Sequence, residues 1–229
     1  MSEQEKPPAA RRPKLRVAAE RQDYEGTFAL DPEKPEERAQ LMTRVRHHPD
    51  AEVRYLAAAL LRGEPVLAEI ALGDPDPRVR RAAILHLGDA DLWVLAPILA
   101  GEPDPDVAML ALACVRAETL AGEALLARTV LSHRRPEIRL EALLKKRWDR
   151  EPLALRLLES ESDHETAARA LREVHDRDAL RRLADALPTA ALRAAAARRI
   201  AVIDELRARS KPPGGNRPGD GGTGPRRGR

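Results

Sequence analysis

The residues best suited to chemistry are six histidines and one cysteine, and their spacing gives no catalytic or metal-binding set. The histidines are His47, His48, His86, His133, His164 and His175. A helix that holds a metal through two histidines carries them at positions i and i+4, and no pair here has that spacing. Cys114 has no histidine near it in the chain, so we expect a small buried thiol rather than a nucleophile.

Other signatures of catalysis give the same answer. The glycines fall singly at helix ends or in the C-terminal tail, so no glycine-rich phosphate loop is predicted. Paired carboxylates such as Glu36 and Glu37 stand at expected helix starts, where they complement the helix dipole. We therefore expect no enzymatic activity, no cofactor and no metal.

One segment, residues 74–88, predicts a complete capped helix on which the rest of the chain is patterned. Asp76 is a good N-cap because its carboxylate can accept hydrogen bonds from first-turn N–H groups. Pro77 occupies the first helical position, where its missing N–H costs nothing. Val79 and Ala83 belong to an apolar stripe at four-residue steps, and Gly88 can take the left-handed conformation that ends a helix.

Five weaker copies of this helix give the chain six motif copies with a period of about 28 residues. The positions equivalent to Val79, from the first copy to the sixth, are Val53, Val79, Val107, Ile138, Thr166 and Leu192. Alanine stands four residues later in every copy, as Ala57, Ala83, Ala111, Ala142, Ala170 and Ala196. A fixed small residue on the apolar stripe lets a neighbouring helix pack closely.

Three further positions of the motif vary in an informative way. Five copies have a good N-cap three residues before the reference position, namely Asp50, Asp76, Asp104, Asp163 and Thr189, and the exception is Arg135. The residue after the reference is Arg54, Arg80, Arg139 or Arg193 in four copies and Ala108 or Ala167 in the other two. Eight residues after the reference, Lys146 is the only polar residue.

Shorter amphipathic segments separate these helices, so each copy reads as helix–turn–helix. A unit this short cannot bury its own apolar face and must stack on its neighbours. We expect a stacked region over residues 33–209 and a disordered, basic, Pro/Gly-rich tail over residues 210–229. Residues 1–32 are expected to be a disordered or loosely packed extension, in which Tyr24 and Phe28 cover the first copy.

The pattern Asp-Pro-Asp-Pro-x-Val-Arg-x-x-Ala followed by Leu-Gly resembles the short HEAT-like repeat of phycobilisome-lyase-type proteins. The resemblance covers roughly residues 35–207 and implies an all-α fold, a right-handed α-solenoid of about six repeats. The runner-up is a leucine-rich-repeat variant with a similar Pro-Asp-x-x-Val-Arg start, but its period is shorter and its cysteine cluster is absent here.

In the HEAT-like family, the Asp and Arg of the motif form hydrogen-bonded ladders between repeats. The resemblance gives that structural role to Asp50, Arg54, Asp76, Arg80, Asp104, Arg139, Asp163 and Arg193. Ala108, Ala167 and Arg135 depart from the pattern, which predicts an interrupted ladder between the third and fifth copies.

Charge and composition bound the partners. The formal net charge is +3, but residues 1–16 and 208–229 are basic, so the region between them is mildly acidic. An acidic region does not match the basic footprint of a nucleic-acid binder. One cysteine, a polar N-terminus and the absence of a long apolar run predict a cytoplasmic protein that does not engage a membrane.

We therefore expect a non-catalytic scaffold or adaptor that binds a protein or peptide partner on the inner face of the solenoid. Candidate contacts on the second helices are Glu64, Glu69, Asp91, Trp93 and Glu159. Packing between helices is the alternative role for Trp93 and the expected one for Trp148. Two other functions stay open, which are a HEAT-like enzyme of glycosylase or lyase type and nucleic-acid association through the basic tail.

Overall fold

The computed structural model describes residues 13–87 and 92–210, and that part of the chain is helical without strands. The predicted all-α class is confirmed. The chain divides into two compact units, Met1–Leu153 and Ala154–Arg229. None of the described helices is long and apolar enough to cross a membrane.

In the first unit, the described helices are α1 (Pro13–Phe28), α2 (Pro35–His47), α3 (Ala51–Leu60), α4 (Val66–Gly73), α5 (Pro77–His86), α6 (Leu92–Gly101), α7 (Pro105–Cys114), α8 (Leu120–Ser132) and α9 (Pro136–Lys145). Helix α10 (Arg150–Ser160) crosses the boundary between the units. The second unit continues with α11 (His164–Ala170), the 3₁₀ helix η1 (Leu171–Glu173), α12 (Arg177–Ala186) and α13 (Ala190–Ser210).

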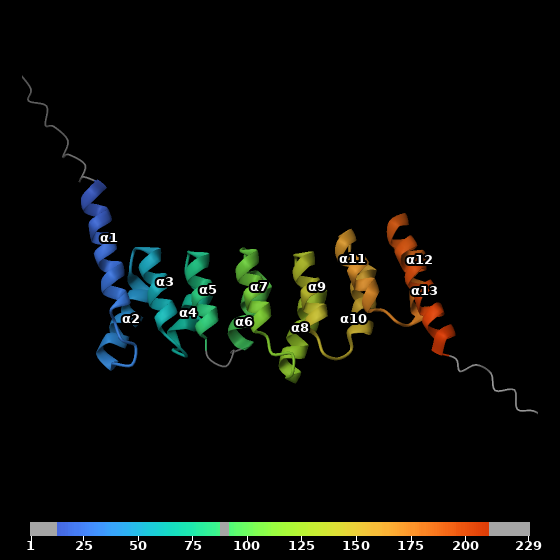
Figure 1. Cartoon of the computed structure of the whole chain (residues 1–229), viewed down its shortest axis with the longest axis horizontal. Coiled ribbons are helices and arrows are strands. Elements are labelled where there is room, and N and C mark those ends of the chain that lie inside the picture. Colours follow the sequence, from blue (N-terminus) through green and yellow to red (C-terminus); the bar gives the residue numbers. More distant parts are fainter. Residues whose placement is uncertain (1–12, 88–91, 211–229) are drawn as a thin grey trace, which may run out of the picture. The chain divides into compact units, whose positions relative to one another are not determined.

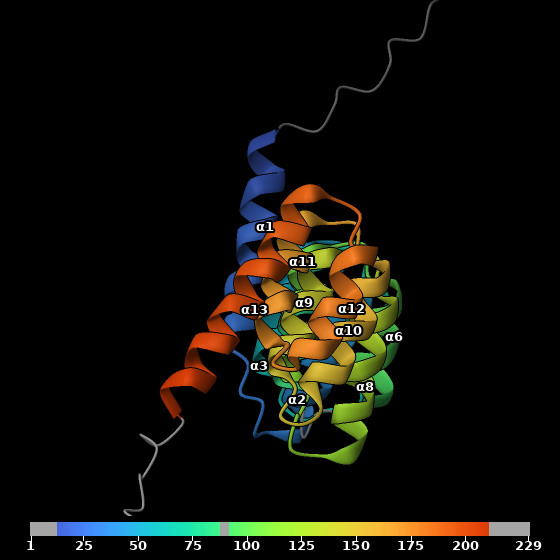
Figure 2. The same ribbon diagram turned by 90° about the vertical axis from the view of Figure 1, so that its right-hand side faces the viewer.

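Helices of the first unit lie in two layers (Figure 1). In one layer α1, α3, α5, α7 and α9 each pack against the next, and in the other α2, α4, α6 and α8 do the same. Hairpin contacts between α2 and α3, α4 and α5, α6 and α7, and α8 and α9 join the layers. Figure 2 shows the unit end-on, with α6 and α8 on the side away from α1.

The predicted caps explain where the helices begin. Asp50, Asp76 and Asp104 lie in extended conformation and accept hydrogen bonds from first-turn N–H groups. Asp163 caps α11 in the second unit in the same way. Arg135 makes no side-chain cap, as its type predicts.

Burial confirms the register of the six motif copies. The reference residues and the alanines four positions later are all buried, and each of the six alanines is completely inaccessible to solvent. A side chain larger than alanine at these positions would have to displace the helix packed against it.

Apolar residues follow the last turn of three motif helices. Helix α5 ends at His86, and Leu87 has left the helical conformation at the C-cap. The equivalent residues Leu61 and Val115 are extended. Leu61 and Val115 are buried and Leu87 is half-buried, so each contacts the core directly after its helix. Gly88, which was predicted to end the helix, lies outside the described residues.

The N-terminal extension also needs correction. Residues 13–28 form α1, which packs beside α3, while residues 1–12 lie outside the described residues. Phe28 is 69% exposed, so the prediction that it covers the first copy is wrong. The buried residue of this turn is Thr27, whose hydroxyl donates to the carbonyl of Asp23 and accepts from Arg44 of α2.

In the second unit, α13 packs against α11, η1 and α12. Arg177 of α12 forms a two-pronged ion pair with Asp204 of α13, at 2.6 and 2.8 Å. Arg199 of α13 donates to the carbonyl oxygens of Arg172 and Val174. The predicted C-terminal tail begins at the end of α13, and residues 211–229 lie outside the described part of the chain.

Candidate functional site

The first unit offers three kinds of candidate site, which are the predicted reactive groups, the ion pairs between helices and the exposed apolar residues. Cys114 is partly buried, and burial raises the pKa of its thiol although Lys145 opposes the shift. A thiol with a raised pKa is a poor nucleophile at neutral pH. Within the described residues no group of three or more His, Cys, Asp or Glu side chains is placed to hold a metal ion.

The predicted arginine ties exist, but their acidic partners are different. Arg54 of α3 pairs through Nε and Nη2 with Asp74, at 2.8 and 3.1 Å. Arg80 of α5 pairs with Glu102 in the same two-pronged way, at 2.9 and 2.6 Å. Both pairs are buried, and the carboxylate of Asp74 raises the pKa of Arg54. Each pair joins one motif copy to the next.

The predicted partners Asp50, Asp76 and Asp104 cap their own helices instead. The pairing acid stands two residues before the N-cap, where its carboxylate also accepts the N–H of the capping residue. The acid two residues before the N-cap lies where the chain enters the helix, next to the arginine of the preceding copy. The N-cap carboxylate instead faces the first-turn N–H groups of its own helix and does not contact that arginine.

Each of these arginines makes a second contact with its own copy. The Nη1 group of Arg80 donates to the carbonyl of Asp74 at 2.7 Å, six residues back in the chain. Arg54 does the same with the carbonyl of His48, at 2.9 Å. Arg139 and Arg193 repeat the contact, both at 2.7 Å. Each guanidinium therefore bonds the segment that precedes its own helix. The guanidinium groups of Arg54 and Arg80 also bond the segment that precedes the equivalent helix of the next copy.

Between the third and fourth copies the tie runs in the opposite direction. Ala108 stands where an arginine is expected, and the carbonyls of Glu102 and Pro103 need another donor. Arg134 donates to Glu102 and Arg135 to Pro103, both at 2.6 Å. The arginine–carboxylate ladder is therefore interrupted at this junction, as the sequence predicts, and Arg134 and Arg135 link the two copies through backbone carbonyls instead.

The acid two residues before the cap is replaced where its arginine is missing. At the junction where Ala108 replaces the arginine, the acid position holds His133. Where Ala167 replaces the arginine, the acid position holds Leu187. The Nδ1 atom of His133 accepts the backbone N–H of Arg135 at 3.0 Å, so only the ion pair is lost. This covariation within one sequence is the signal that could have identified the true partners.

A third buried ion pair explains the polar exception at Lys146. Its ammonium group bonds Glu123 of α8, and both side chains are 8% exposed. Burial would raise the pKa of Glu123, but the Arg147 amide, 2.7 Å away, and Lys146 together lower it. Gly122 is required beside it, because an added Cβ would lie 1.7 Å from the carbonyl oxygen of Arg116.

Of the five predicted partner contacts, Glu64, Glu69 and Trp93 lie in the described part of the first unit. Glu64 lies 3.6 Å from Arg38 and Glu69 lies 3.2 Å from Arg46, so arginines of α2 offset both charges. Glu159 is exposed on α10 in the second unit. Asp91 lies outside the described residues.

Trp93 belongs to a different surface, which we call the aromatic edge and define by Trp93, Leu120 and Trp148. Their exposed fractions are 61%, 86% and 49%, so neither tryptophan is buried, contrary to the packing expected for Trp148. Trp93 and Leu120 lie in the first turns of α6 and α8, which pack side by side. Trp148 comes next in the chain after Arg147, whose backbone N–H donates to the Glu123 carboxylate of α8.

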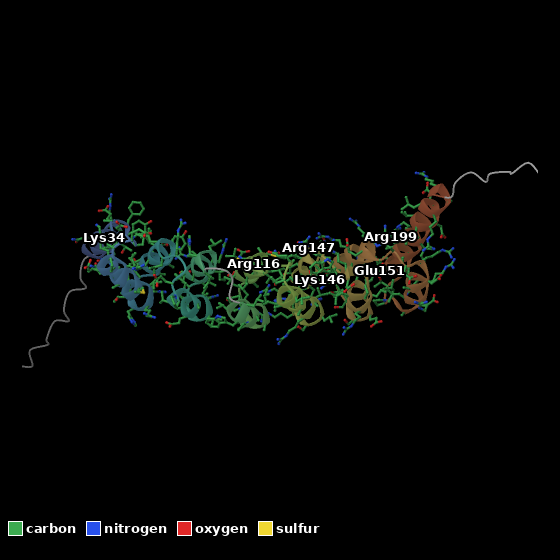
Figure 3. The ribbon with its side chains drawn as sticks, turned by 90° about the horizontal axis from the view of Figure 1, so that it is seen from below. Lys34, Arg116, Lys146, Arg147, Glu151 and Arg199 are labelled. Atoms are coloured by element: carbon green, nitrogen blue, oxygen red, sulfur yellow. The ribbon has the colours of Figure 1, made fainter. Side chains whose placement is uncertain are left out.

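Charged side chains flank the aromatic edge. Arg116 and Arg147, which are labelled in Figure 3, are both exposed. The guanidinium of Arg147 lies over the Trp148 ring at 5.6 Å from its centroid, within the range of a cation–π contact. Asp149, next in the chain, has a φ of 54°, a left-handed conformation that is uncommon for a residue other than glycine.

No protein-family model matches this chain, and a comparison with curated proteins gives no match. Its function must therefore be argued from the chain itself.

Proposed function

We propose that the motif copies stack as a right-handed HEAT-like α-solenoid of about six repeats, and that the chain is a non-catalytic scaffold for a protein or peptide partner. Equivalent helices pack side by side through the first unit, and equivalent alanines are buried throughout both units, which supports the stacking. Stacked repeats present extended surfaces, and their common use is binding.

The observation that carries the binding role is the aromatic edge. Several large apolar side chains are rarely left in water close together on a surface, and exposed apolar patches mark interaction sites. Tryptophan beside arginine is also the pairing enriched among residues that dominate binding energy. The acidic inner face predicted from the sequence is a weaker candidate, because Glu64 and Glu69 already have arginine partners.

The test begins with affinity capture of a partner from the native host and proceeds to binding measurements with both components purified. Trp93→Ala and Leu120→Ser should each weaken binding by about tenfold or more. Leu206→Ser is the matched control, because Leu206 is 58% exposed on α13 and does not belong to the aromatic edge. If the edge variants and the control bind the purified partner as well as the parent, the edge is not the binding surface.

A further inference from the structure

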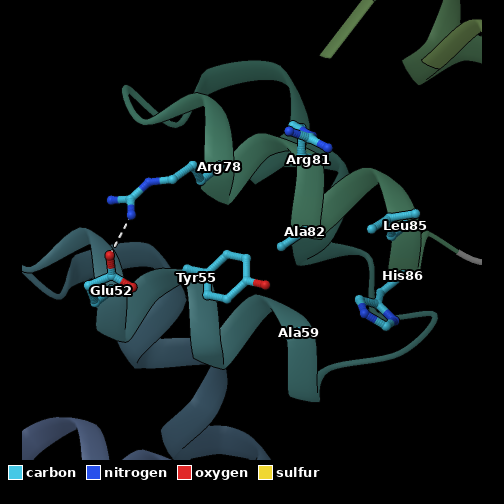
Figure 4. Close-up of a pocket in the computed structure, with 8 residues that line it drawn as sticks. All are labelled: Glu52, Tyr55, Ala59, Arg78, Arg81, Ala82, Leu85 and His86. Atoms are coloured by element: carbon cyan, nitrogen blue, oxygen red, sulfur yellow. Dashed lines mark hydrogen bonds and ion pairs between the residues drawn. The ribbon is translucent and has the colours of Figure 1, made fainter. Parts of the chain in front are cut away.

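A furrow between α3 and α5, in the layer that also holds α7 and α9, is separate from the aromatic edge. Its volume is about 290 Å³, and Tyr55 and Leu85 stand beside it with 41% and 60% of their surfaces exposed. Figure 4 shows the small side chains of Ala59 and Ala82 between them. The result is a shallow apolar slot on the surface of the first unit.

The side chains that line the furrow carry one net positive charge, from Arg78 and Arg81 of α5 against Glu52 of α3. Arg78 already bonds Glu52 (Figure 4) and also Asp76. Arg81 lines the same wall, and its closest carboxylate oxygen, on Asp106, is 3.8 Å away. Beyond the other end, Arg62 is close enough to contribute to the lowered pKa of His86. A ligand with carboxylates would find cations that are weakly paired.

A comparison within the unit shows that this charge is particular to the α3–α5 furrow. A second furrow of about 320 Å³ lies between α7 and α9 and is lined by Met109 and Leu144. Its charged residues are Glu141 and Lys145, one of each sign. Both furrows are apolar, and only the α3–α5 furrow combines an apolar floor with an excess of arginine.

We propose that the α3–α5 furrow docks an acidic segment of a partner protein that inserts one apolar side chain between Tyr55 and Leu85. The volume is at the lower limit of ligand pockets and suits a single side chain. Arg81 and Arg62 then pair with flanking carboxylates, which provides orientation and faster association. The inference does not depend on the aromatic edge, which lies on other helices.

The probe is a short fluorescein-labelled polyglutamate peptide with one central leucine, titrated into the full chain by fluorescence anisotropy. We expect saturable binding that weakens about tenfold in each of Arg81→Glu and Leu85→Ser. Replacing the peptide's leucine by serine should weaken binding to the parent by a similar factor. Because Arg81 and Leu85 are exposed, these variants should retain the circular dichroism and melting temperature of the parent.

Two matched controls separate docking from general attraction. Arg128→Glu makes the same charge change at an exposed site on α8, and Leu206→Ser removes an exposed leucine from α13, which belongs to neither proposed surface. Both should bind the peptide like the parent. Methyl NMR should place the shifted resonances at Ala59, Ala82 and Leu85.

The proposal is overturned if the peptide fails to bind, or if Arg128→Glu weakens binding as much as Arg81→Glu. It is also overturned if the serine peptide binds as tightly as the leucine peptide. Failure of the edge variants with the native partner would leave these peptide results unchanged, so the two proposals fail independently.

Discussion

Removing the Arg80 side chain should destabilise the first unit more than removing any exposed arginine. Arg80→Ala deletes two hydrogen bonds to Glu102 and leaves that carboxylate buried, with the Asp104 N–H as its remaining donor. It also removes the donor to the carbonyl of Asp74. Breaking a buried pair by deleting one partner costs about 3–5 kcal/mol, so we expect a loss of about 4 kcal/mol.

The assay is urea unfolding followed by tryptophan fluorescence. The chain has two tryptophans, Trp93 and Trp148, and both lie in the first unit, so the signal reports on that unit. Arg81→Ala is the control, since this neighbouring side chain is half-exposed and its nearest carboxylate is 3.8 Å away. An exposed pair contributes at most about 1 kcal/mol.

A double-mutant cycle completes the test. Glu102→Ala alone should also be costly, because it leaves the Arg80 guanidinium buried, and the double variant should lose less than the sum of the two singles. Equal small losses for Arg80→Ala and Arg81→Ala, or strict additivity in the cycle, would refute the role given to this pair.

Three further predictions concern packing, pH and the buried Lys146–Glu123 pair. Ala83→Leu should lower the free energy of unfolding by about 1–3 kcal/mol, whereas Ala113→Leu, at an exposed position, should be tolerated; equal stability of both variants would mean that the motif register is wrong. Burial lowers the pKa of His133, so below a pH of about 6.5 the unfolded chain binds a proton more readily than the folded chain does. The free energy of unfolding should therefore fall as the pH is lowered. His133→Asn, which keeps an acceptor for the backbone N–H, should flatten that part of the pH profile in urea titrations, and an unchanged profile would exclude His133 as its source. Lys146→Met should cost about 3–5 kcal/mol, while Lys146→Met with Glu123→Met should recover most of the loss, measured by the same fluorescence; no recovery would contradict the pairing.

Local chemistry made much of the fold predictable. The caps at Asp50, Asp76 and Asp104 depend on residues within the same turn, and the sequence spacing alone identified them. The invariant alanine was equally readable, because close helix packing at a repeated position requires a small side chain.

The partners of the charged residues were harder to predict, because they depend on contacts between motif copies. Asp74 looks like part of a turn, and only the folded chain places it against Arg54. Lys146 was recognised as exceptional, but its partner Glu123 lies on another helix. Trp93 is exposed because it lies in the first turn of α6, at the end of the helix layer. Helical periodicity identifies the face of a helix but not whether its end is covered.

The first four motif copies are tied one to the next by arginine, in a direction set by the residues before the cap. The most direct test combines Ala108→Arg with a replacement of residues 133–135 by Glu-Pro-Asp, the sequence found at residues 102–104. Ala108→Arg alone should be destabilising, because Arg134 and Arg135 already bond the carbonyls it would reach and His133 offers no charge. In the replaced background the new arginine should gain an acid and two free carbonyls, and the measured free energy of unfolding should rise when Ala108→Arg is added. An equal loss of stability from Ala108→Arg in both backgrounds would contradict the account.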